Sequence, residues 1–195
     1  LFYSDVEQAQ KMRNYELIGR LAAFLWRSAP DQRLFDLAAR ENAITDTEMS
    51  TEAKRMLADS RAERFIADFA YSWTGLPKID QIAINPNYYR WWNPKYKDYI
   101  RQEPVAFMKT LLREDLSCLN LLSSEFMVVN DVLAKYYGVA LPASGHRFSR
   151  VPASEGRGGI LTQAAFLLGH SDGEDAHAVN RGVWLRGRLL GDPPR

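Results

Sequence analysis

The stretch "RMLADSRAERFIADFAYSWTGLP", residues 55–77, decides the fold class because it carries a clear helical period. Its large apolar side chains Phe65, Phe69 and Trp73 are four residues apart, so they share one face of a helix. Gly75 follows the last of them, as a glycine often does where a helix ends. The stretch therefore predicts an amphipathic helix that packs these three side chains into a core.

The same spacing recurs along most of the chain. Further helices are expected near residues 14–27, 30–38, 45–58, 94–112, 130–137, 160–168 and 179–190. The side chains expected to join the core are Leu21, Leu25, Phe107 and Leu111. Strand signals are scarce, with one short strand expected at 147–151. The prediction is an all-α fold, an irregular multi-helix domain with long loops and little or no sheet.

Several helix ends carry their own signals. Asn14 is placed to cap the first helix, and Pro30 to occupy the first turn of the second. Asn130 and Gly138 frame a short helix as its N-cap and its closing residue. Pro104 lies inside a longer helical pattern, which we expect it to kink or divide, because proline removes a backbone donor.

Composition limits the class of protein. The chain has 195 residues, of which 46% are apolar, so it can bury a substantial core. Lys and Arg total 25 against 24 for Asp and Glu, so no electrostatic field favours nucleic acid as a partner. No apolar run reaches the roughly 20 residues of a membrane span. Cys118 is the only cysteine, which excludes an intrachain disulfide and a C-x-x-C-H haem attachment within this sequence.

The stretch "GHSDGEDAHAVNRGVW", residues 169–184, concentrates ionisable groups. His170, Asp172, Glu174 and His177, together with Asp175, are residue types that bind zinc, iron or manganese. Their spacing matches neither the H-E-x-x-H helix nor the EF-hand loop. The alternative is a polar connector in which an acidic side chain lies near the positive end of the last helix dipole. We favour the connector and expect no metal site here.

Two other segments invite a functional interpretation. Residues 85–99 contain a cluster of tyrosines and tryptophans that either forms a stacking platform for sugars or a partner protein, or packs over the end of the helices. We favour packing. The stretch "EGRGGI", residues 155–160, lacks the spacing and the lysine of a phosphate-binding loop. Its glycines are expected to allow tight entry into the next helix.

Four stretches in this order resemble a known pair of adjacent domains. They are "NYELIGRLAAFLWRSAPDQRLFDLA", "RMLADSRAERFIADFAYSWTGL", "MVVNDVLAKYYGV" and "RGGILTQAAFLLGHSDGEDAHAVNRGVWLRGRLLGDPP". Together they resemble domains of unknown function from very large planctomycete-type proteins that also carry c-type cytochrome domains. The resemblance covers nearly the whole chain. It departs at His170 and Ser171, where such proteins often have Thr-Ser, and at Ala178, where proline is common.

The resemblance implies a domain division and a cellular context. Residues 1–140 are expected to form one helical domain, and residues 141–195 the start of a second, short helical domain packed on the first. Both chain ends look cut, so we expect a piece of a larger exported protein, located outside the cytoplasm or in the periplasm. Its partners would be other domains of the same chain, including cytochrome domains. Haem c would lie in those domains, with no cofactor in this segment.

Two functions from different classes follow. The first is a non-catalytic helical scaffold or interaction module. The second is a contribution to an oxidoreductase or hydrolase active site through residues 170–177. In either case Arg157 and Arg181 flank this loop in the sequence, and we expect them to anchor it by pairing with its carboxylates or by capping a helix.

Overall fold

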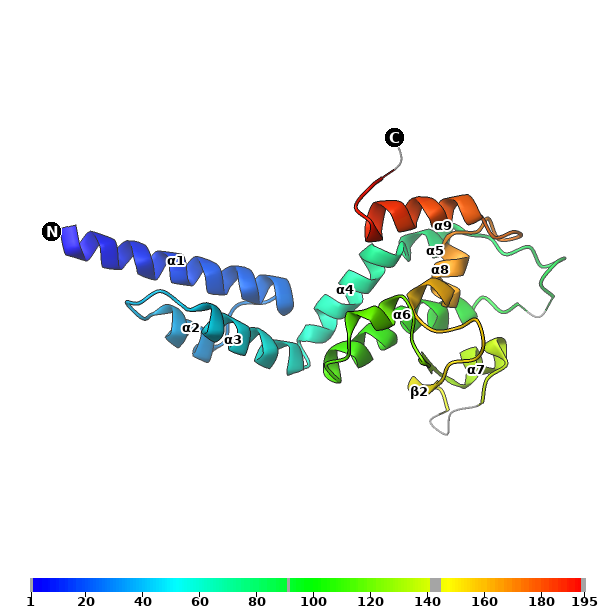
Figure 1. Ribbon diagram of the computed structural model, residues 1–195, viewed down its shortest axis with the longest axis horizontal. Helices are drawn as coiled ribbons and strands as arrows, with labels where there is room; N and C mark the ends of the chain where they lie inside the picture. Colours follow the sequence, from blue (N-terminus) through cyan, green and yellow to red (C-terminus); the bar gives the residue numbers. More distant parts are fainter. Residues whose placement is uncertain (1, 91, 141–144, 194–195) are drawn as a thin grey trace. The chain divides into compact units, whose positions relative to one another are not determined.

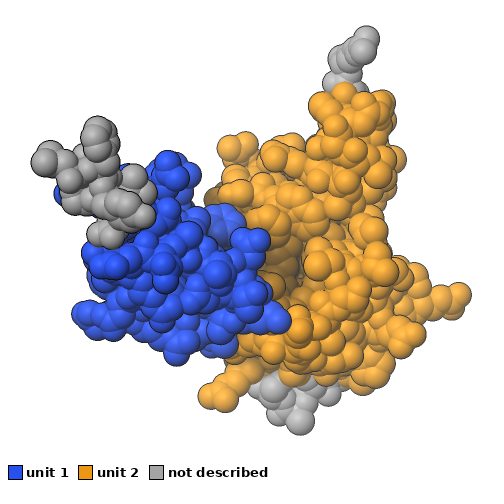
Figure 2. All heavy atoms as spheres, turned by 60° about the vertical axis from the view of Figure 1, so that its left-hand side comes forward, with its two compact units in different colours: residues 1–67 blue, residues 68–195 orange. Residues whose placement is uncertain are grey.

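A computed structural model describes residues 2–90, 92–140 and 145–193, with side chains from residue 8 onward (Figure 1). The described chain is 59% helical and 6% strand, which confirms the predicted mostly α-helical fold. It forms two compact units, Leu1–Ala67 and Asp68–Arg195 (Figure 2). The division expected at residue 140 concerns sequence domains and stays a prediction; part of that boundary, residues 141–144, lies outside the described residues.

The first unit is built from helices. They are α1 (Phe2–Leu25), α2 (Gln32–Ala38), α3 (Asp46–Ala58) and the first turns of α4 (Ala62–Thr74). Thr45 starts α3 with a reciprocal capping box, in which the Thr45 side chain accepts from the Glu48 backbone N–H and the Glu48 carboxylate accepts from the Thr45 backbone N–H. Local capping chemistry thus fixes where α3 begins.

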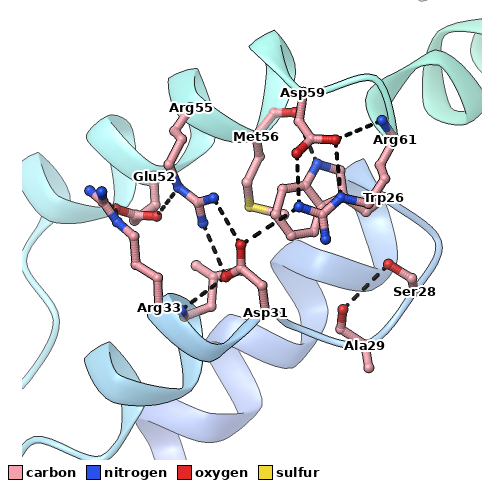
Figure 3. Close-up of polar contacts among 11 residues, drawn as sticks. Trp26, Ser28, Ala29, Asp31, Arg33, Glu52, Arg55, Met56, Asp59 and Arg61 are labelled. Carbon is pink, nitrogen blue, oxygen red and sulfur yellow. Dashed lines mark hydrogen bonds and ion pairs between the residues drawn. The ribbon is translucent and has the colours of Figure 1, made fainter.

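Trp26 is the centre of this unit's core. Its side chain is 0% exposed, and its indole Nε1 donates to the Met56 carbonyl oxygen at 2.9 Å. The Arg61 guanidinium carbon lies 3.3 Å from the centre of the indole ring (Figure 3). Arg61 also pairs with Asp59 at 2.8 Å, so the cation is held over the ring by its own neighbour. One side chain therefore ties the end of α1 to both ends of the α3–α4 connection.

A group of ion pairs surrounds this contact. Asp31 caps α2 by accepting from the Leu34 backbone N–H at 3.1 Å, and it also accepts from the Arg55 guanidinium at 2.9 and 3.2 Å (Figure 3). Arg55 in turn donates to the 5%-exposed Glu52 at 2.7 Å. These contacts join α2 to α3, and they place Asp31 rather than Pro30 at the start of α2.

Two predicted side-chain roles in these helices are wrong. Asn14 does not cap a helix: it lies inside α1, 2% exposed, and its amide donates to the Arg40 and Asn42 carbonyl oxygens. Pro30 precedes the N-cap of α2 instead of occupying its first turn. The two errors have different causes: a tertiary contact buries Asn14 within α1, whereas the neighbouring Asp31 supplies the cap of α2.

The buried face of α4 is shifted by one residue along the chain from the predicted face. Its most buried positions are Ala62, Ile66, Ala70 and Thr74. Phe69, expected to face inward, is 43% exposed and stacks on Trp73 with ring centres 5.5 Å apart. Of the other expected core residues, Leu25, Phe107 and Leu111 are buried, whereas Leu21, Phe65 and Trp73 are half-buried. Large aromatic rings along α4 therefore lie at the edges of the buried stripe, which non-aromatic side chains occupy.

The second unit contains the remaining elements. Its α-helices, after the end of α4, are α5 (Pro77–Gln81), α6 (Tyr96–Arg113), α7 (Asp131–Tyr137), α8 (Ala164–Gly169) and α9 (Ala178–Trp184). Two 3₁₀ turns, η1 (Cys118–Leu121) and η2 (Ile160–Thr162), and a π-helical segment that follows α9, η3 (Leu185–Leu189), complete the described helical elements. Pro104 lies within α6, which continues through it, so the predicted division of this helix does not occur. Within the described ranges, no helix is both long and apolar enough to span a membrane.

A two-stranded antiparallel sheet lies among these helices. Strand β1 (Phe126–Val129) pairs with β2 (Ser149–Pro152), with Met127 opposite Val151. The sequence predicted a strand close to β2 but missed β1, because a four-residue apolar run that is buried throughout has no alternation to distinguish it from a helix. Asn130 caps α7 directly after β1, and Gly138 closes α7 at φ 66°, as predicted.

The role of Trp26 gives a stability prediction. We expect Trp26→Ala to lower the free energy of unfolding by about 3–5 kcal/mol, because it leaves a cavity and an unpaired Met56 carbonyl oxygen. Urea denaturation followed by circular dichroism measures the change. Met12→Ala, in the preceding helix α1, is the control, since Met12 is 69% exposed. A loss below about 1 kcal/mol for Trp26→Ala would contradict this account of the core.

Candidate functional site

Residues 170–177 form a closed turn between α8 and α9. The His177 backbone N–H donates to the His170 carbonyl oxygen at 3.1 Å, and the Asp172 N–H donates to the Asp175 carbonyl oxygen at 3.3 Å. Ser171 and Ala176 form an isolated antiparallel bridge. The loop is therefore a small hairpin whose shape is determined by its own backbone hydrogen bonds.

Asp172 organises the tip of this hairpin. One carboxylate oxygen accepts from the backbone N–H groups of Asp175 at 2.8 Å and Glu174 at 2.9 Å. The other lies 3.0 Å from His177 Nε2. The two backbone donors, with His177, lower the pKa of Asp172 to about 2. Asp172 thus acts as the anionic acceptor of a turn.

His170 points away from that turn. It is 3% exposed, its Nδ1 lies 2.8 Å from the Phe166 carbonyl oxygen, and its ring centre lies 4.4 Å from that of Phe166. Burial lowers its pKa, so the ring is neutral and Nδ1 is the donor in this contact. Among the residues that the structure describes, no group of three or more His, Cys, Asp or Glu side chains is arranged to hold a metal ion.

The hairpin packs tightly on the segment that follows α5. Gly173 has φ 97°, and a Cβ atom at this position would collide with the Ala83 carbonyl oxygen. The Glu174 carboxylate accepts from Asn85 Nδ2 at 2.6 Å, and the Glu174 carbonyl oxygen accepts from the Tyr89 hydroxyl at 2.6 Å. The loop and the aromatic segment are distant in sequence, but the fold brings them together.

A pocket lies where these segments meet. It has a volume of about 260 Å³, and its lining includes Tyr89, Trp92, Tyr136, Glu174, Asp175 and Arg181. A neighbouring hollow of about 450 Å³ shares Trp92 and Tyr136 with it. Of the aromatic segment, Tyr89 and Trp92 are half-buried, Tyr88 is 70% exposed, and residue 91 lies outside the described residues. Trp92 therefore packs against the core, as the sequence favoured, and together with Tyr89 it also lines the pocket.

The two arginines at the flanks of the loop lie in different surroundings. Arg157 donates from Nη1 to the Thr162 carbonyl oxygen at 3.0 Å, and its guanidinium carbon lies 4.9 Å from the centre of the Tyr137 ring. Arg181 is half-buried and lines the pocket beside Asp175. Their role as anchors of the loop stays a prediction.

The glycines beside Arg157 allow a close backbone approach. Gly158 and Gly159 have φ angles of 113° and 80°, and side chains there would collide with the backbone of residues 121–124. Gly159 is also the residue from which η2 begins. They serve entry into a helical turn, as the sequence indicated.

A buried carboxylate that sequence analysis missed lies in the same unit. Glu103 of α6 is 1% exposed and accepts from the Tyr137 hydroxyl at 2.6 Å and from the Ala164 backbone N–H at 3.1 Å. The Ala165 backbone N–H is a further donor, and the charge of Arg157 acts on the same group. Burial raises the pKa of Glu103 to about 7, although these contacts favour its ionised form. Its position on the buried face of α6, between Ile100 and Phe107, was the available signal.

The unit of residues 68–195 is thus a mostly α-helical unit that joins a tight polar hairpin to a pocket lined in part by aromatic side chains. The chain belongs to the PSD4 family, which is described as "Protein of unknown function (DUF1592)". The family model matches residues 12–139. Residues 157–195 match PSCyt3, a second protein of unknown function (DUF1588). These names suggest planctomycete cytochrome-associated proteins, which confirms the resemblance drawn from the sequence. No curated protein and no solved structure matches the chain.

The packing of the hairpin gives a mutational prediction. We expect Gly173→Ala to lower the free energy of unfolding by more than about 2 kcal/mol, because the new Cβ atom meets the Ala83 backbone at a positive φ. Gly182→Ala in α9 is the matched control, since its Cβ meets no atom within 4 Å. Alanine there should be neutral or stabilising by up to about 1 kcal/mol. Denaturant unfolding, together with amide exchange of residues 82–85, measures the effect of each substitution. Equal losses of stability in the two variants would contradict the contact between Gly173 and Ala83.

Glu103 gives a prediction of pH dependence. Its carboxyl keeps a proton up to about pH 7 in the fold but loses it near 4.5 in the unfolded chain, so the folded state binds more protons between these values. The free energy of unfolding should therefore fall as pH rises through this window, by a contribution on the order of 3 kcal/mol.

Comparison of Glu103→Gln with the unmodified chain isolates this contribution. The variant should lack the decline, and subtraction removes the opposite trend expected from the lowered pKa of His170. Denaturant unfolding at pH 5, 6, 7 and 8 gives the difference. Glu155→Gln, at an exposed glutamate, should follow the unmodified chain. Parallel pH profiles for the Glu103 variant and the unmodified chain would refute the assignment.

Proposed function

We propose that this chain is a non-catalytic helical scaffold or interaction module of a larger exported multidomain protein that carries c-type cytochrome domains. The proposal rests on the hydrogen bonds that the ionisable groups of residues 170–177 make within the fold. Asp172 accepts from two backbone N–H groups and contacts His177, while His170 bonds to a helix carbonyl oxygen. Groups committed in this way shape a connector between helices.

The family membership supports the cytochrome part of the proposal. Both matching families have names that suggest cytochrome-associated proteins. Haem c would be carried by other domains, because this sequence contains one cysteine, Cys118, and the usual attachment motif requires two. Those domains are the proposed partners, and an extracytoplasmic or periplasmic location is part of the same proposal, based on the family alone.

A second candidate function is a contribution to an oxidoreductase or hydrolase active site. The observation in its favour is that Glu174, Asp175 and Arg181 line the pocket next to the hairpin. Carboxylates beside an apolar cavity are a common setting for acid–base chemistry. This candidate would use Glu174 or Asp175, with His177 beside them in the chain, if a metal or a substrate from another domain completed the site.

Metal titration and haem analysis separate the two candidates. For the scaffold, calorimetric titration of this chain with zinc and manganese should give no submicromolar site, and the purified chain should contain no stoichiometric metal. The full-length natural protein should contain covalent haem by pyridine haemochrome assay. Submicromolar binding that is lost in His177→Ala would favour the active-site candidate, and a full-length protein without haem would refute the cytochrome context.

A further inference from the structure

We propose that the pocket beside the hairpin, called here the Trp92 pocket, binds a neutral sugar. Its lining includes three aromatic residues, Tyr89, Trp92 and Tyr136, three charged residues, Glu174, Asp175 and Arg181, and apolar side chains such as Leu167 and Leu168. This inference goes beyond the scaffold role and does not depend on it, because it concerns a ligand of this chain rather than its neighbouring domains.

The size of the pocket suits a small ring. Its volume of about 260 Å³ is near the lower end of ligand pockets, which are typically about 300–1,000 Å³. The neighbouring hollow of about 450 Å³ shares Trp92, Ile100 and Tyr136 with it. A linear oligosaccharide could therefore place one ring in the Trp92 pocket and the next ring on the other side of Trp92 and Tyr136.

The lining matches the two kinds of surface that a sugar ring presents. Tyr89, Trp92 and Tyr136 supply aromatic faces, which pack well against the C–H faces of a pyranose. The charged residues supply both acceptors, in Glu174 and Asp175, and donors, in Arg181. A sugar hydroxyl both donates and accepts, so a neutral polyol can satisfy all three groups.

The charges also argue against other occupants. Two carboxylates against one guanidinium give these groups a net charge of −1, which opposes a carboxylate or phosphate ligand, while the Arg181 guanidinium offers no acceptor to a cation. A purely apolar ligand would leave these three charged groups to lose water without a partner, which is costly. A neutral ligand rich in hydroxyls avoids each of these penalties.

The polar wall is rigid before any ligand arrives. The Tyr89 hydroxyl donates to the Glu174 carbonyl oxygen, and Asn85 holds one oxygen of the Glu174 carboxylate. Gly173 meets the Ala83 backbone at a distance that admits no side chain. A turn in which the Trp92 N–H donates to the Tyr89 carbonyl oxygen at 2.9 Å fixes the spacing of the two aromatic residues. Because these groups are already ordered, binding loses little conformational entropy.

Titration of the 195-residue chain with defined oligosaccharides tests the proposal. The neutral probes are cellotetraose, xylotetraose and mannotetraose, and the charged probes are tetragalacturonate and chitosan tetramer. Intrinsic tryptophan fluorescence and calorimetry provide the readouts. At least one neutral probe should bind with a dissociation constant below about 1 mM, and tetragalacturonate should bind roughly tenfold more weakly, whereas tighter binding of the chitosan tetramer would indicate a cation site instead.

Variants assign the binding to the pocket. Trp92→Ala should weaken the neutral probe by roughly tenfold or more, whereas Tyr88→Ala, at an exposed ring in the same segment, should not. Asp175→Asn provides a second test if Trp92→Ala does not fold, and should reduce the discrimination against tetragalacturonate. The proposal is overturned if no neutral probe binds, if a charged probe binds more tightly, or if folded Trp92→Ala binds as the unmodified chain does. If Trp92→Ala does not fold, unchanged discrimination in Asp175→Asn overturns it.

Discussion

The buried carboxylate of Glu103 is the contact on which the unit of residues 68–195 depends. It lies on α6 and accepts hydrogen bonds from Tyr137 at the end of α7 and from the backbone at the start of α8. A carboxylate in a core is costly unless several donors surround it, so this one group specifies how three helices meet. The hairpin follows α8 directly, and the Trp92 pocket is lined by α6, α7 and α8 residues, so both are positioned by this contact.

In the unit of residues 1–67, an aromatic ring instead of a carboxylate makes the contact that joins the helices. Trp26 is fully buried, with Arg61 covering one face of the ring, and its N–H is satisfied by the Met56 carbonyl oxygen. The surrounding ion pairs involve side chains that are mostly part-exposed, so each alone contributes little. Their value lies in orientation: Arg61, held by Asp59, remains over the ring, and Asp31 both caps α2 and binds α3.

The hairpin shows how local hydrogen bonds engage residue types that can also bind metals. Asp172 and His177 have the residue types of ligands, but a short turn has several backbone N–H groups that need an acceptor, and Asp172 is the nearest one. His170 is separated from them because the chain direction at the end of α8 turns its ring toward Phe166. Glu174 remains available to a pocket because only one of its carboxylate oxygens is held by Asn85.

The sequence by itself determined the features that depend on neighbouring residues. These are the helical class, the cap at Asn130, the αL glycine at Gly138 and the family. Tertiary structure decided the features that need partners distant in sequence: the one-residue rotation of α4, the buried role of Asn14, strand β1, and the Glu103 carboxylate. The physical reason is that periodicity reports which residues can share a face, whereas burial of a polar group is favourable only when a donor or acceptor from another element reaches it.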